Sequence, residues 1–348
     1  MAGLRKSKST NRVTVKDVSS AAGVSTATVS RVLAGFDEVS EQTRQRVLDA
    51  AKSLNYQPNR AARDLRKRTT SKIGVIISDI QNPFFGSVVR GVEKNTIQDD
   101  FTLVLGNSDE DPQREQKLLS MLLEEGVAGV ILAPTSSDMS SYNEFCCSGT
   151  PFVFIDRRLP IPDVDMVLVD GEAGTEMAVN HLLQLGHTRI GYVGGLKRLS
   201  VMHEREQGYL KSLRKHGLPV ISEYLRMGDN RQSGGYTAVS ELLRLSAPPS
   251  AILIANNLMT LGGLQAIHDQ GLEIPEHVSV VGFDDMDWAP SLRPPLTCIA
   301  QPAFEMGETA AAIMLSRIRN PDQPHKTVVL DTHLINRASC RNMHIAQE

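Results

Sequence analysis

Short apolar runs bounded by glycine, proline or aspartate recur from Ile73 onward and constrain the fold more than any other feature of the chain. Between most of them lie stretches with apolar residues at helical spacing, such as REQKLLSMLLEEG at 114–126 and MAVNHLLQLGH at 177–187. Buried strands that alternate with amphipathic helices are typical of parallel sheets with helices on both faces. The runs are IGVIISDI (73–80), TLVLGNSD (102–109), VAGVILAP (127–134), PFVFID (151–156), MVLVD (166–170), RIGYVGG (189–195), AILIANN (251–257) and VSVVGFDD (278–285).

So many strands exceed what one small doubly wound sheet uses, so we expect two lobes. Polar side chains collect where the strands end, and open α/β sheets bind ligands at the carboxyl edge of their strands. The body of the chain is therefore expected to be a small-molecule binder or an enzyme. The polar residues are Asp79, Asp109, Asp156, Asp170, Asn256, Asn257, Asp284 and Asp285.

Charge divides the 348-residue chain into two parts. The formal net charge is only -3, but residues 1–72 hold 15 Lys and Arg against 6 Asp and Glu, while the remainder holds 22 against 34. A basic head on an acidic body indicates a polyanion bound by the head alone.

The head contains three short predicted helices before residue 56. Thr14 and Asp17 form a capping-box pattern for the first, which ends at Gly23, while Ser25 and Ser40 are predicted to cap the second and third. The second helix lies in GVSTATVSRVLAG at 23–35, which is rich in hydroxyl groups at its leading end. A helix, a turn containing glycine and a second helix with a polar start are typical of the helix-turn-helix arrangement.

In that arrangement the second helix enters the major groove by its first residues. We expect Thr26 and Ala27 to face base edges, and Arg31 to contact guanine O6 and N7. The hydroxyl groups expected to bind phosphate are those of Thr14, Ser25, Thr28 and Ser30.

The head motif VTVKDVSSAAGVSTATVSRVL, continued by VSEQTRQRVLDAAKSLNYQPNRAARDL, closely resembles the lactose- and galactose-repressor (LacI/GalR) family of bacterial transcription regulators. The resemblance spans nearly the whole chain, through IGVIISDIQNPFF, LLQLGHTRIGYVGG, AILIANN, VSVVGFDD, RPPLT and INRAS. It implies a helix-turn-helix head on a two-lobed core of the periplasmic-binding-protein type, with an effector held between the lobes. The implied division is a head at 1–57, a hinge helix and linker at 58–72, and a core at 73–341, with lobe one at about 73–168 and 302–327 and lobe two at about 169–301 and 328–341.

The resemblance also implies a hinge helix from Pro58 to Leu65 that lies in the minor groove, with Leu65 wedged between the central base pairs. An apolar wedge flanked by arginines suits a minor groove, because phosphate contacts offset the cost of unstacking. The other matched hinge residues are Asn59, Arg60, Ala61 and Ala62.

Several strand-end residues match effector-binding positions of the family. Asp156 and Asp284 are suited to accept hydrogen bonds from vicinal hydroxyls, Arg205 presents a fork of donors, and Asn256 is both donor and acceptor. An aromatic ring beside Asp79 would cover an apolar sugar face. The remaining candidates are Phe84, Phe85, Arg157 and Gln301, with Asp170 and Trp288 as weaker ones.

Two departures from the family pattern leave the effector open. Asn257 replaces an acid that is common after the ILIA strand, and Asn230 stands where some members have an aromatic residue. Two carboxylates in the cleft favour a neutral sugar over a phosphorylated one. A nucleoside or a phosphoprotein co-regulator is the alternative.

The sequence thus predicts a dimeric, operator-binding transcription regulator, a repressor that a small sugar-like effector releases. One alternative is a ligand that acts as a corepressor. The other is a sugar-modifying enzyme with a DNA-binding head, which would need a phosphate cradle; neither the Gly-x-Gly-x-x-Gly pattern nor the P-loop pattern occurs in the sequence.

The sequence also bears on the cellular location of the protein and on its need for a metal or other cofactor. Its four cysteines have no metal-ligand spacing, its first residues carry no apolar leader, and no apolar run is long enough to span a membrane. We therefore expect a cytoplasmic protein with reduced thiols that uses no metal or other cofactor.

Overall fold

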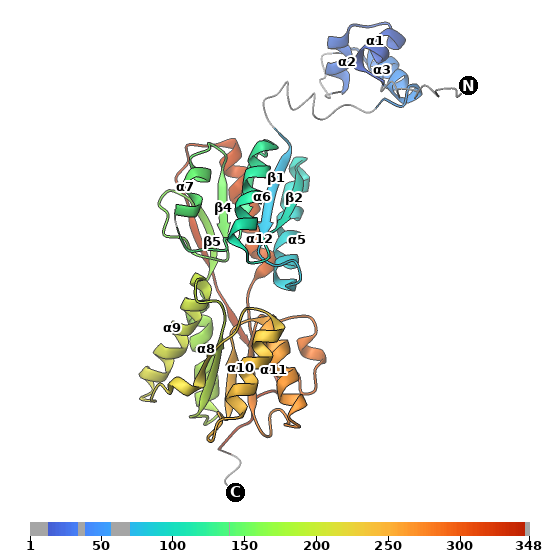
Figure 1. The fold of residues 1–348 in the computed structure, drawn as a ribbon. Coiled ribbons are helices and arrows are strands. Elements are labelled where there is room, and N and C mark those ends of the chain that lie inside the picture. The colour runs from blue at the N-terminus through green and yellow to red at the C-terminus, as the bar shows by residue number, and fades with distance from the viewer. Residues whose placement is uncertain (1–12, 34–38, 57–69, 139, 345–348) are drawn as a thin grey trace, which may run out of the picture. The chain divides into compact units, whose positions relative to one another are not determined.

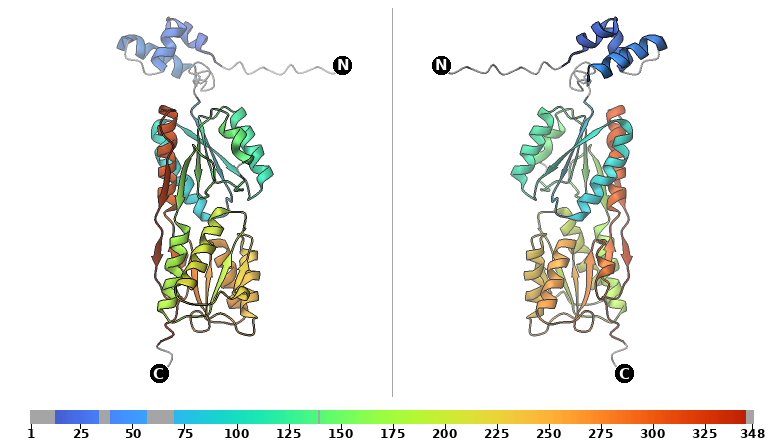
Figure 2. Two further views of the ribbon diagram at one scale, coloured as in Figure 1. Left: turned by 90° about the vertical axis from the view of Figure 1, so that its left-hand side faces the viewer. Right: turned by 90° about the vertical axis from the view of Figure 1, so that its right-hand side faces the viewer.

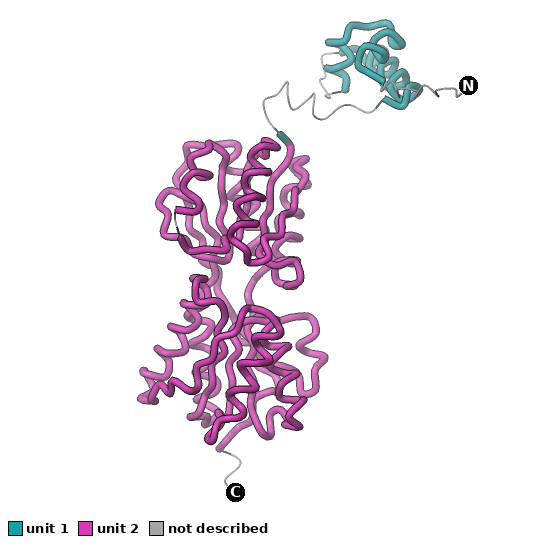
Figure 3. The backbone as a smooth tube through the Cα atoms, in the orientation of Figure 1, with its two compact units in different colours: residues 1–70 teal, residues 71–348 magenta. Residues whose placement is uncertain are grey.

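The computed structural model describes residues 13–33, 39–56, 70–138 and 140–344. It divides the chain into two compact units, residues 1–70 and 71–348 (Figure 3).

The first unit is a bundle of three helices around a small apolar core. Its helices are α1 (Val15–Ala22), α2 (Thr26–Leu33) and α3 (Glu41–Ser53). Val18, Val29 and Val47 are fully buried where the helices meet. Two helix starts follow the prediction: the Asp17 carboxylate accepts hydrogen bonds from the Thr14 amide and hydroxyl, and Ser25 Oγ accepts one from the Thr28 amide. Ser40 precedes α3 as predicted, but its hydroxyl donates to Thr43 Oγ1 and caps no amide. Gly23 ends α1 with a left-handed φ of 64°, which favours glycine.

The second unit holds two lobes, each built on a six-stranded sheet (Figure 1). All eight apolar runs form strands, as predicted. The first lobe contains β1 (Lys72–Ile77), α5 (Pro83–Thr96), β2 (Thr102–Asn107), α6 (Pro112–Glu124), β3 (Gly129–Leu132), α7 (Ser140–Cys146), β4 (Phe152–Ile155), β5 (Asp165–Val169), α12 (Ala303–Arg319) and β11 (Thr327–Leu330). The second contains α8 (Gly171–Gln184), β6 (Ile190–Gly194), α9 (Ser200–Lys215), β7 (Leu225–Met227), α10 (Gln232–Leu243), β8 (Ala251–Ile254), α11 (Asn257–Asp269), β9 (Ser279–Phe283), β10 (Thr297–Ala300) and β12 (His333–Ile335).

The two sheets repeat one topology. Their strand orders are β2-β1-β3-β4-β5-β11 and β7-β6-β8-β9-β10-β12, and all neighbours are parallel except β10 and β12. Side chains that alternate along each strand fill separate cores on the two faces. In lobe one, Val75 and Ile77 pack with α5 and α12, whereas Ile76 packs with α6. In lobe two, Leu253 faces the α8 and α9 side and Ile254 faces the α10 and α11 side.

The chain crosses between the lobes three times, and the last crossing differs from our prediction. We expected lobe two to resume at about residue 328. That boundary was wrong: Thr327–Leu330 pairs in parallel with β5 in the sheet of lobe one, and only His333–Ile335 joins the second sheet. The reason is burial, since Val328 and Leu330 pack against the lobe-one core.

Helices α5 and α12 lie side by side on the same face of the first sheet (Figure 2). They approach so closely that a Cβ on Gly91 would lie 2.1 Å from the Phe304 carbonyl, and one on Gly307 would lie 2.0 Å from the Val88 carbonyl. Glycine at both positions therefore fixes how the returning helix α12 joins lobe one.

At the far end of lobe two, His187 is buried and connects the chain's C-terminal segment to the sheet. Its Nδ1 lies 2.9 Å from Ser250 Oγ, and its Nε2 lies 3.0 Å from Ser279 Oγ and 3.1 Å from the Arg341 carbonyl. Burial lowers the pKa of His187 to about 4. The folded protein thus favours neutral imidazole, and this stabilisation is present above the ordinary pKa and declines as the pH falls towards 4.

Acidification from pH 7 to 5 should therefore cost the core on the order of 2 kcal/mol of unfolding free energy through His187. Urea unfolding at both pH values measures it. The His187→Gln variant should lose less stability on acidification than the wild type, and His203→Gln, at an exposed position on α9, serves as the control. Equal acid sensitivity of wild type and His187→Gln would contradict this account.

Candidate functional site

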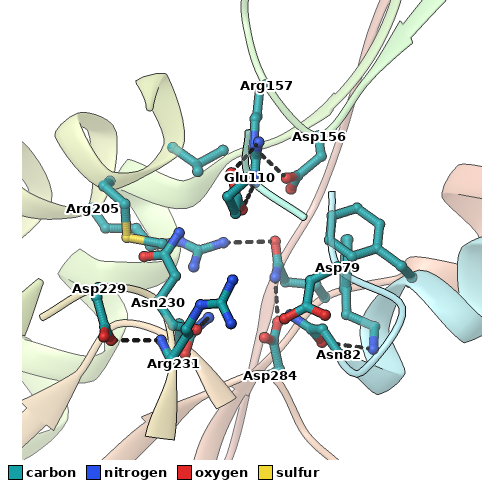
Figure 4. Close-up of a pocket in the computed structure, with 16 residues that line it drawn as sticks. Asp79, Asn82, Glu110, Asp156, Arg157, Arg205, Asp229, Asn230, Arg231 and Asp284 are labelled. Carbon is teal, nitrogen blue, oxygen red and sulfur yellow. Dashed lines mark hydrogen bonds and ion pairs between the residues drawn. The ribbon is translucent and has the colours of Figure 1, made fainter. Parts of the chain in front are cut away.

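The carboxyl edges of the two sheets face each other across a shared cavity (Figure 4). All nine residues that the sequence singled out for effector binding line it: Asp79, Phe84, Phe85, Asp156, Arg157, Arg205, Asn256, Asp284 and Gln301. They come from both lobes, so the cavity depends on how the lobes are arranged. The two weaker candidates lie elsewhere, since Asp170 caps α8 and Trp288 packs beside the lobe-two core.

Asp156 and Asp284 occupy equivalent places in the two sheets. Each follows the fourth strand in the shared order, and each donates its backbone N–H to the neighbouring strand, to Val167 and Ile299 respectively. Both have left-handed backbones, with φ of 66° and 72°. Such conformations in residues other than glycine cost about 1–3 kcal/mol and are concentrated at functional sites.

Both carboxylates are withdrawn from water. Burial raises the pKa of Asp156, and the charges of Arg157 and Arg205 oppose this shift. Burial likewise raises the pKa of Asp284, against the charge of Arg205 and a hydrogen bond from Gln301. A ligand hydroxyl that donates to either carboxylate would favour its ionised form.

Arg205, on α9, is the main donor of the lobe-two side. Its Nη1 donates to the Ala255 carbonyl at 2.6 Å, its Nη2 donates to Gln301 Oε1 at 3.2 Å, and its guanidinium stacks on the Phe283 ring at 3.8 Å. Gln301 in turn donates to Asp284. The buried Nε of Arg205 has no hydrogen-bond partner among the described residues, which leaves a donor for a ligand.

Arg157, in contrast, uses both terminal nitrogens of its guanidinium to bond other residues of lobe one. It donates to Ser78 Oγ at 2.9 Å, to the Pro134 carbonyl at 2.7 Å and to the Glu110 carboxylate at 3.0 Å. These bonds join the ends of four neighbouring strands. Arg157 therefore orients the acidic groups of the cavity more than it offers free donors.

The apolar and amide residues complete the wall. The rings of Phe84 and Phe85 lie edge to face, 5.1 Å apart, at the start of α5. Asn256 caps α11 through the Met259 amide, so only part of its amide group is open to a ligand. Asp79 accepts a hydrogen bond from the Gln81 amide and shapes the turn after β1.

The two departures from the family pattern have structural roles. Asn257 donates through Nδ2 to Asn82 Oδ1 at 2.8 Å, a bond between the lobes. Asn82 Oδ1 also caps α5 through the Phe84 amide, so the partner of Asn82 must be a donor, as asparagine is and an ionised aspartate is not. Asn230 has a left-handed φ of 66°, and its Oδ1 accepts a hydrogen bond from the Leu196 amide.

Sequence reasoning missed several residues of the cavity. Glu110 follows the edge strand β2, and Asp229 follows the edge strand β7. Strand β7 is only three residues long, so the sequence offered no apolar run there. The wall thus carries five carboxylates against three arginines, an excess of negative charge. The missed residues are Asn82, Glu110, Val201, Met202, Asp229 and Arg231, with Asn230 noted only as a departure.

In the first unit, α2 presents the predicted contacts to solvent. Ser25, Thr26, Ala27 and Arg31 are exposed, whereas Thr28 and Ser30 are half-buried. The Thr28 hydroxyl lies 2.9 Å from Ser25 Oγ, so it takes part in the hydrogen bonding at the start of α2. Its contact with phosphate stays a prediction. The predicted hinge contacts, Asn59, Arg60, Ala61, Ala62 and Leu65, lie outside the described residues.

Comparison with known proteins fits both units. The model for bacterial regulatory proteins of the lacI family matches residues 14–59, and that for a periplasmic binding protein-like domain matches residues 179–340. The transcriptional repressor CytR of Escherichia coli is 33% identical over 338 residues, which cover 97% of this chain and 99% of CytR. The chain belongs to the LacI family. It is a DNA-binding transcriptional regulator.

Other relatives of this LacI-family regulator agree. The repressor PurR of Mannheimia succiniciproducens is 33% identical over 95% of the chain and 99% of its own length. A lac repressor dimer bound to operator and the anti-inducer ONPF superposes with a TM-score of 0.87 at 28% identity, over 95% of this chain and 100% of the other. The regulator CelR in complex with cellobiose superposes with a TM-score of 0.73 at 32% identity, over 94% and 100%.

No group of three or more His, Cys, Asp or Glu side chains among the described residues could hold a metal ion. None of the helices within the described ranges is long and apolar enough to cross a membrane.

Arg31 provides the test of the DNA-contacting helix. Replacing it with alanine should remove a bidentate contact to guanine, worth about 1–3 kcal/mol of discrimination, and leave most non-specific binding. Fluorescence anisotropy with an operator selected from a random duplex library, and with scrambled duplex, measures both affinities.

The matched control is Arg46→Ala, at an exposed position on α3, which should lower both affinities equally if it contacts phosphate. If Arg31→Ala kept the wild-type preference for the operator, α2 would not be the reading helix.

Proposed function

We propose that this regulator is an operator-binding repressor whose operator affinity is set allosterically by a neutral, sugar-like effector bound between the lobes. One observation carries the proposal: paired buried carboxylates on facing lobes, Asp156 and Asp284, with the donor Arg205 between them. Acceptors and donors arranged around a shared space suit a polyhydroxylated molecule.

The charge of the cavity favours an uncharged ligand. Five carboxylates against three arginines would repel a phosphate group, and the arginines are already hydrogen-bonded to protein acceptors. The relative CelR has been solved with cellobiose, and a LacI-family regulator of Enterococcus faecium with ribose, both of them neutral sugars. The phosphorylated-sugar alternative is therefore disfavoured by electrostatics.

A nucleoside that acts as corepressor is the second candidate. Phe84 and Phe85 give the cavity an aromatic side that would cover a planar base. CytR and PurR are named only as repressors, and these names do not say whether a ligand strengthens or weakens operator binding. A direct measurement of the sign of coupling therefore distinguishes a corepressor from an inducer.

We further propose that the regulator acts in the cytoplasm as a homodimer and catalyses no reaction. The lac repressor, its structural relative, was solved as a dimer on operator DNA, and two-fold symmetric DNA reading needs two heads. The hinge role of Leu65, Asn59, Arg60, Ala61 and Ala62 in the minor groove is part of this proposal. The curated relatives are regulators rather than enzymes.

A thermal-shift screen of neutral sugars, sugar phosphates and nucleosides against the full chain tests the effector class. A neutral sugar should raise the melting temperature of the wild type, and Asp284→Asn should abolish the shift because it removes a charged acceptor. Operator affinity measured with the hit then fixes the sign of coupling.

The control variant is Asp163→Asn, at an exposed carboxylate outside the cavity, which should shift as the wild type does. Asp284→Asn should still bind operator through the intact head. A sugar phosphate that stabilised the protein while neutral sugars did not would overturn the proposed effector class.

A further inference from the structure

Arg198 joins the two lobes at a place outside the cavity lining. It lies in lobe two, in the loop between β6 and α9. Its Nη2 donates to the Glu110 carbonyl at 2.7 Å and its Nε donates to the Thr135 carbonyl at 3.2 Å. Its own carbonyl accepts a hydrogen bond from Ser137 Oγ at 2.9 Å. Bonds therefore run in both directions between this one residue and two loops of lobe one.

The first acceptor loop is held in an uncommon conformation. Asp109 and Glu110 both have left-handed backbones, with φ of 56° and 57°, and the Glu110 amide donates to the Ser78 carbonyl at 2.9 Å. The Glu110 carboxylate bonds to Arg157 inside the cavity, at 3.0 Å. Glu110 thus contacts Arg198 through its backbone and a cavity residue through its side chain.

The second acceptor loop is fixed from behind by a buried acid. Glu115 is fully buried on α6 and accepts hydrogen bonds from the Thr135 amide at 2.8 Å and from the Tyr142 hydroxyl at 2.7 Å. The Ser136 amide donates to the same hydroxyl at 3.2 Å. Because both of these backbone amides are anchored, the Thr135 carbonyl has little freedom to move away from Arg198.

Besides the buried Asn257–Asn82 hydrogen bond, two ion pairs between the lobes are of a weaker kind. Arg231 pairs with Asp109 at 2.9 Å and Arg158 with Glu204 at 3.3 Å, and the two arginine side chains are each 49% exposed. Ion pairs between such mobile, exposed side chains contribute little. Arg198 is exposed as well, but its acceptors are two backbone carbonyls whose positions the fold sets, so only the arginine loses side-chain entropy.

We propose that Arg198 is a positioning residue for the regulation of the effector cavity: it stabilises the lobe arrangement of this structure and, through Glu110, couples that arrangement to Arg157. The inference rests on the proposed function. An effector that engages Asp156 or Arg157 shifts the Glu110 loop and with it the Glu110 carbonyl, while the Thr135 carbonyl stays fixed. Removing the Arg198 side chain opens the lobes and weakens the effect of the effector on operator binding.

The test uses the full chain without any added ligand, and Arg198→Met, Arg198→Lys and Lys197→Met as variants. Small-angle X-ray scattering reports lobe opening as the radius of gyration, anisotropy reports the dissociation constant for the selected operator, and a thermal melt reports stability. Lys197→Met is the matched control, because it removes one exposed cation next to Arg198 for which the described part of the chain provides no bond.

Arg198→Met should increase the radius of gyration and change the operator dissociation constant about fivefold or more, the lower end of allosteric couplings. Arg198→Lys, which keeps the charge and loses the fork, should fall between it and the wild type. Lys197→Met should match the wild type. A purely structural role would lower the melting temperature of Arg198→Met and leave its radius of gyration unchanged, which would overturn the proposal.

Failure of this inference is distinct from failure of the proposed function. A wild-type protein without operator preference would contradict the function. A wild type that binds operator, beside an Arg198→Met variant with wild-type scattering and operator affinity, would contradict only the role of Arg198. Ser137→Ala, which removes the reverse hydrogen bond and keeps the arginine, should shift the scattering in the same direction by a smaller amount.

Discussion

The pairing of buried charges between two sheet edges is the constraint on which the function of this regulator depends. Asp284 accepts a hydrogen bond from Gln301, and Gln301 accepts one from Arg205. The positive charges of Arg157 and Arg205 both act on the Asp156 carboxylate. Buried charges are costly unless they are paired, and here some partners belong to the opposite lobe. A ligand that supplies new partners therefore changes the relative free energies of the lobe arrangements.

This dependence explains how a small molecule could act at a distance. A ligand shifts an equilibrium only by the difference in its affinity for the two states. The cavity touches both lobes, and residue 70 lies two positions before β1, the strand between β2 and β3 in the first sheet.

The sequence predicted the fold and the site better where signals are local. Apolar runs located eight strands, and the polar residues that end them gave Asp79, Asp156, Asn256 and Asp284 of the cavity, since parallel strands bring their carboxyl ends to one edge. The other five predicted cavity residues came from the resemblance to the family. Strand β7 is too short to stand out as an apolar run, and the assignment of β11 to lobe one depends on the packing of Val328 and Leu330. The contacts of Arg198 with residues about 60 and 90 positions earlier follow from the tertiary structure alone.

The most direct measurement of the central claim is thermodynamic linkage. Isothermal titration gives the dissociation constant of the stabilising sugar with and without saturating operator, and anisotropy gives that of operator with and without the sugar. The account predicts that both ratios differ from one and equal each other, because coupling free energy is reciprocal. A sugar that binds the free and the operator-bound protein with the same affinity would contradict the account.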